Sequence, residues 1–174
     1  MPVPSVPHAN SRMDTDMRVR PADVETSEFE SPKGTFGVAY RDHVSCQDTG
    51  CPFDLQHVTL KPGKRNFPLH THGSMWELYY ALAGSATMRT DEETVALETG
   101  DSYLCRPGLA HQIINDSGAD FVYLVIANDP PHDTCYYPDS GKLAPGYRKL
   151  WGPMPETWRF WQPQEGVEYF TGEE

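Results

Sequence analysis

Short segments of alternating apolar and polar residues, separated by turn residues, run through the middle of the chain. A period of two is typical of β-strands with one buried face. Residues 121–127 differ because they are apolar throughout, which predicts a strand buried on both faces. The other predicted strands cover residues 34–40, 53–60, 77–83, 85–89, 94–97 and 102–106, with a short strand at 70–72 and another that begins at residue 111.

The segments on either side lack this alternation. Residues 1–30 hold four prolines among polar residues and predict an irregular N-terminal arm. Residues 130–174 are also rich in proline, yet they carry nine aromatic residues, and disordered tails are normally poor in these. We therefore expect a barrel at 31–129 and, at 130–174, a C-terminal extension that packs on the barrel or on a dimer partner. A lid over a functional site is a third placement that stays open.

Length, composition and charge narrow the class of protein. A chain of 174 residues suits one domain, and 14 glycines with 16 prolines favour a turn-rich β protein over a helical bundle. The formal net charge of −11 argues against a surface that binds nucleic acid or an anionic membrane. No apolar run reaches the length of a membrane span, and the N-terminus lacks a secretory pattern. We therefore expect a cytoplasmic protein.

Two histidines and a carboxylate form the first chemical motif. His70 and His72 are two residues apart, so in a strand both imidazoles point to the same face. A turn at Gly73 and Ser74 would bring the chain back and place Glu77 near the start of the next strand. Two imidazoles and one carboxylate suit a first-row metal ion, although an exposed His-x-His with an unrelated Glu is the alternative.

A second stretch adds a third imidazole. Gly100-Asp101 and Pro107-Gly108 predict turns on either side of a short strand. His111 then opens the next strand, and it could reach the same ion from across a barrel. A third histidine in this order makes the metal site the favoured interpretation.

Together, the two stretches resemble the two motifs of the cupin superfamily. The first motif, HxHx4Ex6G, is matched by His70, His72, Glu77 and Gly84. The second is matched by Gly100, Asp101, Pro107, Gly108, His111 and Asn115, with a Pro-Gly pair in place of the usual PxG and one extra residue before Pro107.

The resemblance covers residues 53–129, and the proteins that the chain resembles are small single-domain bacterial cupins. It implies an all-β, double-stranded β-helix (jelly-roll) barrel and a homodimer. It also implies one divalent transition metal, such as iron, manganese, nickel or zinc, on His70, His72, Glu77 and His111.

We expect aromatic and polar side chains to complete a small-molecule pocket beside the ion. The candidates for catalysis are tyrosines whose hydroxyls could face the pocket: Tyr79, Tyr103 and Tyr123. The candidates for the pocket wall are Met75, Trp76, Cys105, His57 and Arg65. Each has a structural alternative, such as a core tyrosine, a buried thiol, a histidine on a barrel face or a solvated basic loop.

Three functions remain open from the sequence. The resemblance includes sugar-phosphate isomerases, and Lys64, Arg65 and Arg106 could bind an anion, so a carbohydrate or sugar-phosphate isomerase is the first expectation. A mononuclear iron dioxygenase is the second. The third is a module that binds a small ligand on the metal without turnover, because the barrel-facing positions offer few acid–base groups.

Overall fold

The computed structural model describes residues 18–147, 160–162, 166 and 170–171, and within them the protein is almost entirely β. The helical elements there are the 3-10 turn η1 (Pro21–Asp23) and the short helix α1 (Cys46–Thr49). The strands are β1 (Ser27–Glu30), β2 (Gly37–Val44), β3 (Asp54–Leu60), β4 (Thr71–His72), β5 (Glu77–Ala83), β6 (Ser85–Thr90), β7 (Thr94–Glu98), β8 (Ser102–Cys105), β9 (His111–Ile114), β10 (Phe121–Ala127), β11 (His132–Tyr137) and β12 (Lys142–Tyr147).

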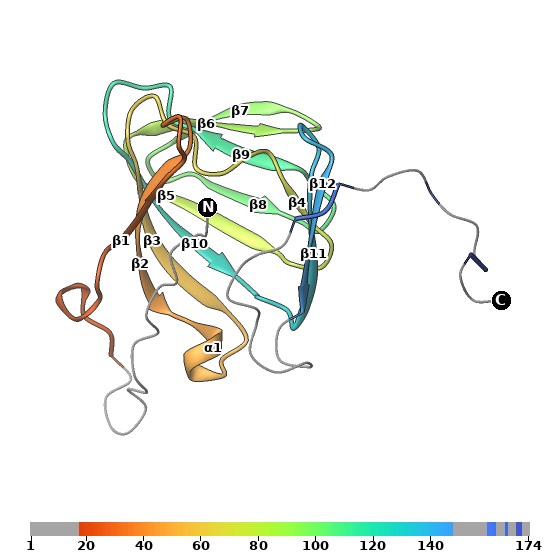
Figure 1. The fold of residues 1–174 in the computed structure, drawn as a ribbon. Helices are drawn as coiled ribbons and strands as arrows, with labels where there is room; N and C mark the ends of the chain where they lie inside the picture. Colours follow the sequence, from red (N-terminus) through yellow and green to blue (C-terminus); the bar gives the residue numbers. More distant parts are fainter. Residues whose placement is uncertain (1–17, 148–159, 163–165, 167–169, 172–174) are drawn as a thin grey trace.

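The strands form an antiparallel barrel (Figure 1). One wall is a six-stranded sheet in the order β1-β2-β3-β10-β5-β8. The other contains the sheet β7-β6-β9, and a third sheet, β12-β11-β4, stands across one end of the strands. The predicted all-β, double-stranded β-helix barrel is confirmed.

β10 lies inside the large sheet, but the prediction that both of its faces are buried is wrong in part. Alternate residues from Phe121 onward are buried, whereas on the other face Ile126 is 37% exposed. β10 pairs with β3 on one side and with β5 on the other. Phe121 and Tyr123 are at most 2% exposed, and they pack in the core with Leu60, Met88 and Ile113. A core of this kind gives the site a rigid support, because its side chains are close-packed.

Gly84 joins β5 to β6 and lies close to Asp120, the residue that precedes β10. Its φ of +79° lies in the left-handed region, and a Cβ built on it would lie 2.3 Å from the carbonyl oxygen of Asp120. Any side chain at this position would therefore strain the backbone of residue 84. It would also clash with the Asp120 carbonyl, which can move only if the chain around it moves.

Two predictions about the ends of the barrel are wrong in part. Ser27–Glu30, inside the segment expected to be irregular, forms β1 and pairs with β2 in a register that joins Phe29 to Val38. Beyond residue 130, where prolines argued against regular structure, β11 and β12 form a hairpin. Pro145 is accommodated within β12, the edge strand of its sheet, where a missing N–H is tolerated.

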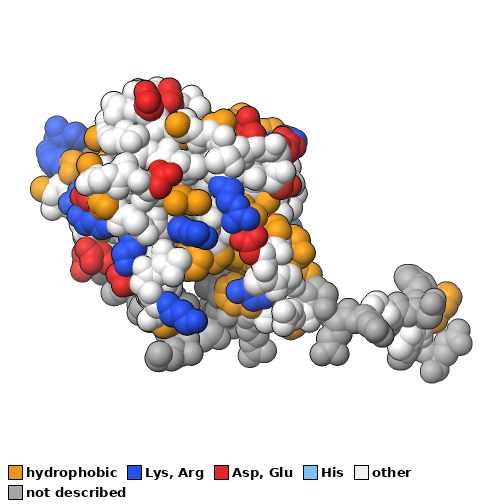
Figure 2. Space-filling view, turned by 90° about the horizontal axis from the view of Figure 1, so that it is seen from above, with side chains coloured by type: hydrophobic (Ala, Val, Ile, Leu, Met, Phe, Trp, Pro, Cys, Tyr) orange, Lys and Arg blue, Asp and Glu red, His pale blue; other side chains and the backbone are white. Residues whose placement is uncertain are grey.

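On the face seen in Figure 2, acidic and basic side chains are interspersed, and the basic side chains do not gather into one continuous patch. Within the part of the chain that the structure describes, no helix is long and apolar enough to cross a membrane.

Candidate metal centre

Backbone pairing brings two of the histidines together. His70, which precedes β4, forms an isolated antiparallel bridge with His111 at the start of β9. The His111 N–H donates to the His70 carbonyl at 2.8 Å, and the reverse bond measures 3.3 Å. The two imidazole centroids consequently lie 4.5 Å apart.

The predicted ligand set converges on one point. The ligand-type atoms of His70, His72, Glu77 and His111 all lie within 4.8 Å of one another. Glu77 Oε2 is 2.7 Å from His111 Nε2 and 3.6 Å from His72 Nε2. His111 and His70 are buried, and the cluster faces a cavity through His70, His72 and Glu77.

Each of the three imidazoles is held through its Nδ1 atom. His70 Nδ1 lies 2.9 Å from the carbonyl oxygen of Pro68, and His111 Nδ1 lies 3.1 Å from that of Leu109. Because a carbonyl oxygen only accepts, both Nδ1 atoms carry the proton and donate. His72 Nδ1 lies 2.5 Å from a carboxylate oxygen of Asp133. The Nε2 atoms thus remain for the centre, which is the usual orientation of metal-binding histidines.

The electrostatics of the cluster suit a cation. Burial lowers the pKa of His70 to about 3, so this imidazole is neutral. Burial raises the pKa of Glu77, but the hydrogen bond from His111 and the nearby imidazoles outweigh it and lower that pKa to about 2. Burial lowers the pKa of His111, whereas its hydrogen bonds to Cys105 and Glu77 raise it to about 10.

This donor set fits a divalent first-row metal ion. Neutral imidazoles and an ionised carboxylate are the forms that bind metals, and binding would release the proton shared between His111 and Glu77. Three nitrogens and one carboxylate also leave one or two positions open in a five- or six-coordinate sphere.

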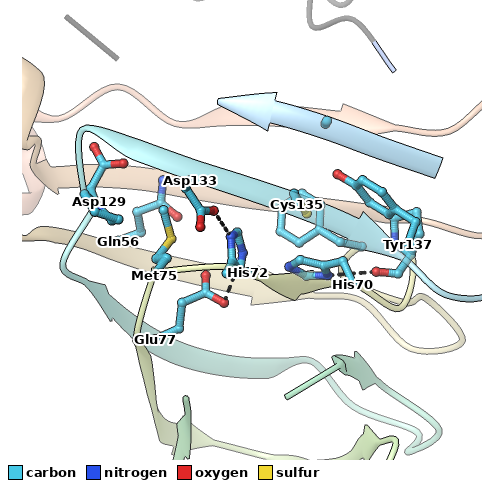
Figure 3. A pocket seen from close by; sticks show the side chains of 13 residues that line it. Gln56, His70, His72, Met75, Glu77, Asp129, Asp133, Cys135 and Tyr137 are labelled. Carbon is cyan, nitrogen blue, oxygen red and sulfur yellow. Dashed lines mark hydrogen bonds and ion pairs between the residues drawn. The ribbon is translucent and has the colours of Figure 1, made fainter. Parts of the chain in front are cut away.

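The cluster lies at the wall of a cavity of about 250 Å³ (Figure 3). Apolar side chains supply much of the remaining wall: Phe67, Pro68, Met75, Pro130 and Ala144. The polar side chains besides the three ligands are Gln56, Asp129, Asp133, Cys135 and Tyr137. Of the described residues, no lysine or arginine lines this cavity.

The structure places two of the three candidate tyrosines in the core. Tyr79 is 4% exposed, and its hydroxyl donates to Glu77 Oε2 at 3.2 Å. Burial, and then the charge of Glu77, hold the pKa of this hydroxyl well above its usual value, so it stays protonated. Tyr123 stacks at an angle on Tyr79 and is equally buried. Neither lines the cavity, so a direct contact with a substrate stays a prediction that this geometry does not favour.

Tyr103 and Trp76 lie further away. The Tyr103 hydroxyl donates to Glu93 at 2.9 Å at the molecular surface. Trp76, which precedes β5, is 45% exposed and does not line the cavity. Met75 lines the cavity.

The remaining wall candidates also lie outside the cavity. Cys105 is buried behind His111. His57 lies beside His43, and its neighbour Gln56 takes the position in the cavity because adjacent residues of β3 face opposite sides. Arg65 forms backbone bridges with Phe36 and Ile114.

Sequence reasoning missed the part of the wall that β11 supplies. Asp133, Cys135 and Tyr137 alternate along this strand and line the cavity. β11 pairs with β4 through Cys135 and His72, so this part of the extension packs on its own barrel at the metal centre. The later aromatic residues between 148 and 159 lie outside the described residues. The only sequence signal was the period-two placement of these three side chains.

A second group of potential ligand atoms belongs to Cys46, Asp54 and Asp129. The Cys46 thiol donates to Asp129, and the Cys46 N–H donates to Asp54. These bonds attach α1 to β3 and to the end of β10, and we assign the group a structural role.

The Tyr79 hydroxyl supports a test of how the ligand Glu77 is held. We expect Tyr79→Phe to weaken zinc binding by about tenfold, because partners that orient metal ligands are typically worth 10–100-fold in affinity. The measurement is competition with a chromophoric chelator. Tyr103→Phe removes a hydroxyl bonded to a surface carboxylate and is the control. Equal zinc affinities for the two variants would contradict the role of Tyr79.

Comparison with known proteins gives the following matches. A protein-family profile described as "Cupin domain" matches residues 56–127. A comparison with curated proteins gives no match. Similar solved structures include a protein from Silicibacter pomeroyi that is described as a sugar phosphate isomerase from a cupin superfamily. Its TM-score is 0.62, with 19% identity over 79% of this chain and 96% of that chain.

Two further solved structures carry other functional names. A predicted oxalate decarboxylase from Thermotoga maritima gives a TM-score of 0.58 and 23% identity over 64% of this chain and 97% of that one. The polyketide cyclase RemF from Streptomyces resistomycificus gives a TM-score of 0.53 and 21% identity, over 63% of this chain and 77% of that one. At these identities the likeness is one of fold.

Proposed function

We propose that the protein, whose residues 56–127 match a family model described as a cupin domain, is a metal-dependent enzyme that acts on a small, uncharged, largely apolar molecule through an oxygen atom of that molecule. The observation that carries this proposal is the character of the cavity beside the four ligands. Its wall is mostly apolar, and its charged groups among the described residues are carboxylates.

The charges of the cavity argue against a phosphorylated substrate. Phosphate sites usually offer arginine, lysine or clustered backbone N–H groups. The three basic side chains considered for this role are engaged or remote: Lys64 pairs with Glu30 at 3.2 Å and Arg106 with Glu92, while Arg65 does not line the cavity. Asp129 and Asp133 would in addition repel a phosphate. A sugar-phosphate isomerase is therefore the less favoured of the two enzyme classes.

The apolar wall favours a mononuclear iron dioxygenase within this proposal. When bound, the ion supplies Lewis-acid polarisation and, if it is iron, redox chemistry with oxygen. The chain's own part is to hold three Nε2 atoms and one carboxylate in place, to exclude water with Phe67, Met75 and Pro130, and to orient the substrate through Gln56 and Tyr137. Isomerisation would in addition require a free base, and Asp133 already holds His72.

The test is oxygen uptake by the iron-loaded protein with a panel of substrates. We expect uptake with uncharged aromatic diols or 1,3-diketones, and neither uptake nor turnover with sugar phosphates. Isomerisation of a sugar phosphate would contradict the proposal. Tight binding of an uncharged ligand without turnover under any metal would favour the second candidate, a binding module, which the small number of acid–base groups supports.

A further inference from the structure

We propose that Asp133 is a positioning residue for the metal ligand His72, and that it couples the hairpin of β11 and β12 to metal binding. The inference rests on the metal centre of the proposed function but does not depend on the reaction. It concerns a carboxylate that belongs to neither of the two sequence motifs.

Both oxygens of Asp133 bond to the segment that carries His72. Oδ2 lies 2.5 Å from His72 Nδ1. Oδ1 accepts the Ser74 N–H at 2.8 Å and lies 3.1 Å from Ser74 Oγ. The side chain is 11% exposed, so these bonds are largely protected from water. Figure 3 shows Asp133 between β11 and His72, on the side of the imidazole away from Glu77.

These contacts determine which nitrogen of His72 is available to an ion. An ionised carboxylate only accepts hydrogen bonds, so Nδ1 carries the proton and donates it to Oδ2. The lone pair is then on Nε2, which faces Glu77 Oε2 at 3.6 Å. The Nδ1 atoms of His70 and His111 bond to backbone carbonyls, whereas that of His72 bonds to a side chain. The partner of His72 can therefore be changed by mutation.

The same residue joins the hairpin to the barrel. The ladder between β11 and β4 consists of the pairs Cys135–His72 and Tyr136–Thr71, and the Gly73 N–H extends it to the Thr134 carbonyl at 2.9 Å. An ion that requires the oriented His72 binds the docked hairpin better than the undocked one. By linkage, binding must then stabilise the docked state.

A second polar anchor at the other end of the hairpin provides the matched control. Asp139, in the turn between β11 and β12, accepts two hydrogen bonds from Arg89 at 2.9 and 3.0 Å. It is not part of the cavity wall. Asp139 is 52% exposed, and exposed ion pairs contribute little to stability. Asp139→Asn therefore makes the same chemical change on the same hairpin, but it leaves both the docking of the hairpin and the His72 imidazole nearly unaffected.

The experiment compares the zinc affinity of Asp133→Asn, Asp139→Asn and the unmodified chain by competition with a chromophoric chelator. An asparagine at 133 has one oxygen for two sets of donors. Its NH₂ group would either face the Ser74 N–H or force the proton of His72 onto Nε2, and both outcomes disturb the ligand. We expect Asp133→Asn to weaken zinc binding by about 10–100-fold and Asp139→Asn to leave it unchanged.

Hydrogen exchange of the unmodified chain gives a second readout that needs no variant. We expect zinc to slow exchange at Ser74 and along 132–137. Equal zinc affinities for both variants, or exchange in this segment that zinc does not change, would overturn the proposal. If the unmodified chain binds no zinc, manganese, nickel or iron, the metal centre itself is wrong, which is a different failure from that of Asp133.

Discussion

Replacement of His111 by alanine is expected to lower the metal affinity by about two orders of magnitude. A four-ligand zinc site is worth about 10–16 kcal/mol in peptides, so one ligand accounts for about 3 kcal/mol, or about 100-fold. His111 also donates to Glu77 at 2.7 Å and pairs through its backbone with His70, so its loss affects two other ligands. The measurement is metal content after purification without a chelating column, followed by a zinc titration.

His57→Ala is the control for this variant. His57 is a histidine on β3 that lies beside His43 and outside the cavity, so its removal should leave metal content unchanged. Circular dichroism of both variants separates loss of the ligand from loss of the fold. An unchanged metal content in a folded His111→Ala protein would show that the four-ligand assignment is wrong.

Of the variants proposed here, Gly84→Ala is expected to lower the free energy of unfolding the most. The left-handed conformation costs an alanine about 1–2 kcal/mol, and the clash with the Asp120 carbonyl, at a Cβ distance of 2.3 Å, adds an overpacking term of about 1–3 kcal/mol. For a chain of this size the sum corresponds to a melting temperature lower by about 10 °C. The measurement is thermal unfolding followed by circular dichroism.

Gly63→Ala separates the two causes. Gly63 has a φ of +74°, close to that of Gly84, but a Cβ there would meet no atom within 4 Å. We therefore expect the conformational term alone, with a melting temperature lower by about 3 °C. If the two variants melted at the same temperature, the close approach of Gly84 to the start of β10 would have no energetic importance.

The metal ligands could be predicted because their geometry is local. His70 and His72 share a face by strand alternation, and the turn at Gly73 and Ser74 returns Glu77 beside them. His111 was a candidate from its position at the start of a predicted strand, and the resemblance supported it, since its spacing alone does not show that β9 crosses beside His70.

The pocket wall was less predictable because alternation gives two faces without saying which one is inside. On β3, Val58 and Leu60 are buried and share their face with Gln56, so the apolar residues already indicated that His57 points the other way. Tyr79 and Tyr123 were expected to face the pocket, but they belong to the core that fills the barrel at their level.

Asp133 had no local signal of its function. It lies after a Pro-Pro pair, beyond the last strand of the predicted barrel, and only the return of β11 to β4 brings it to His72. Such a contact depends on tertiary packing and not on any pattern within a window of the sequence.

The way the imidazoles are held has a consequence for the order in which the centre forms. The Nδ1 partners of His70 and His111 are carbonyls two residues earlier in the chain, whereas the partner of His72 lies 61 residues later. Contacts of short separation form at a small loss of chain entropy, and distant ones follow once the intervening chain has folded. Two imidazoles are therefore oriented with their own strands, and the third waits for the C-terminal hairpin, the last part of the described barrel to leave the ribosome.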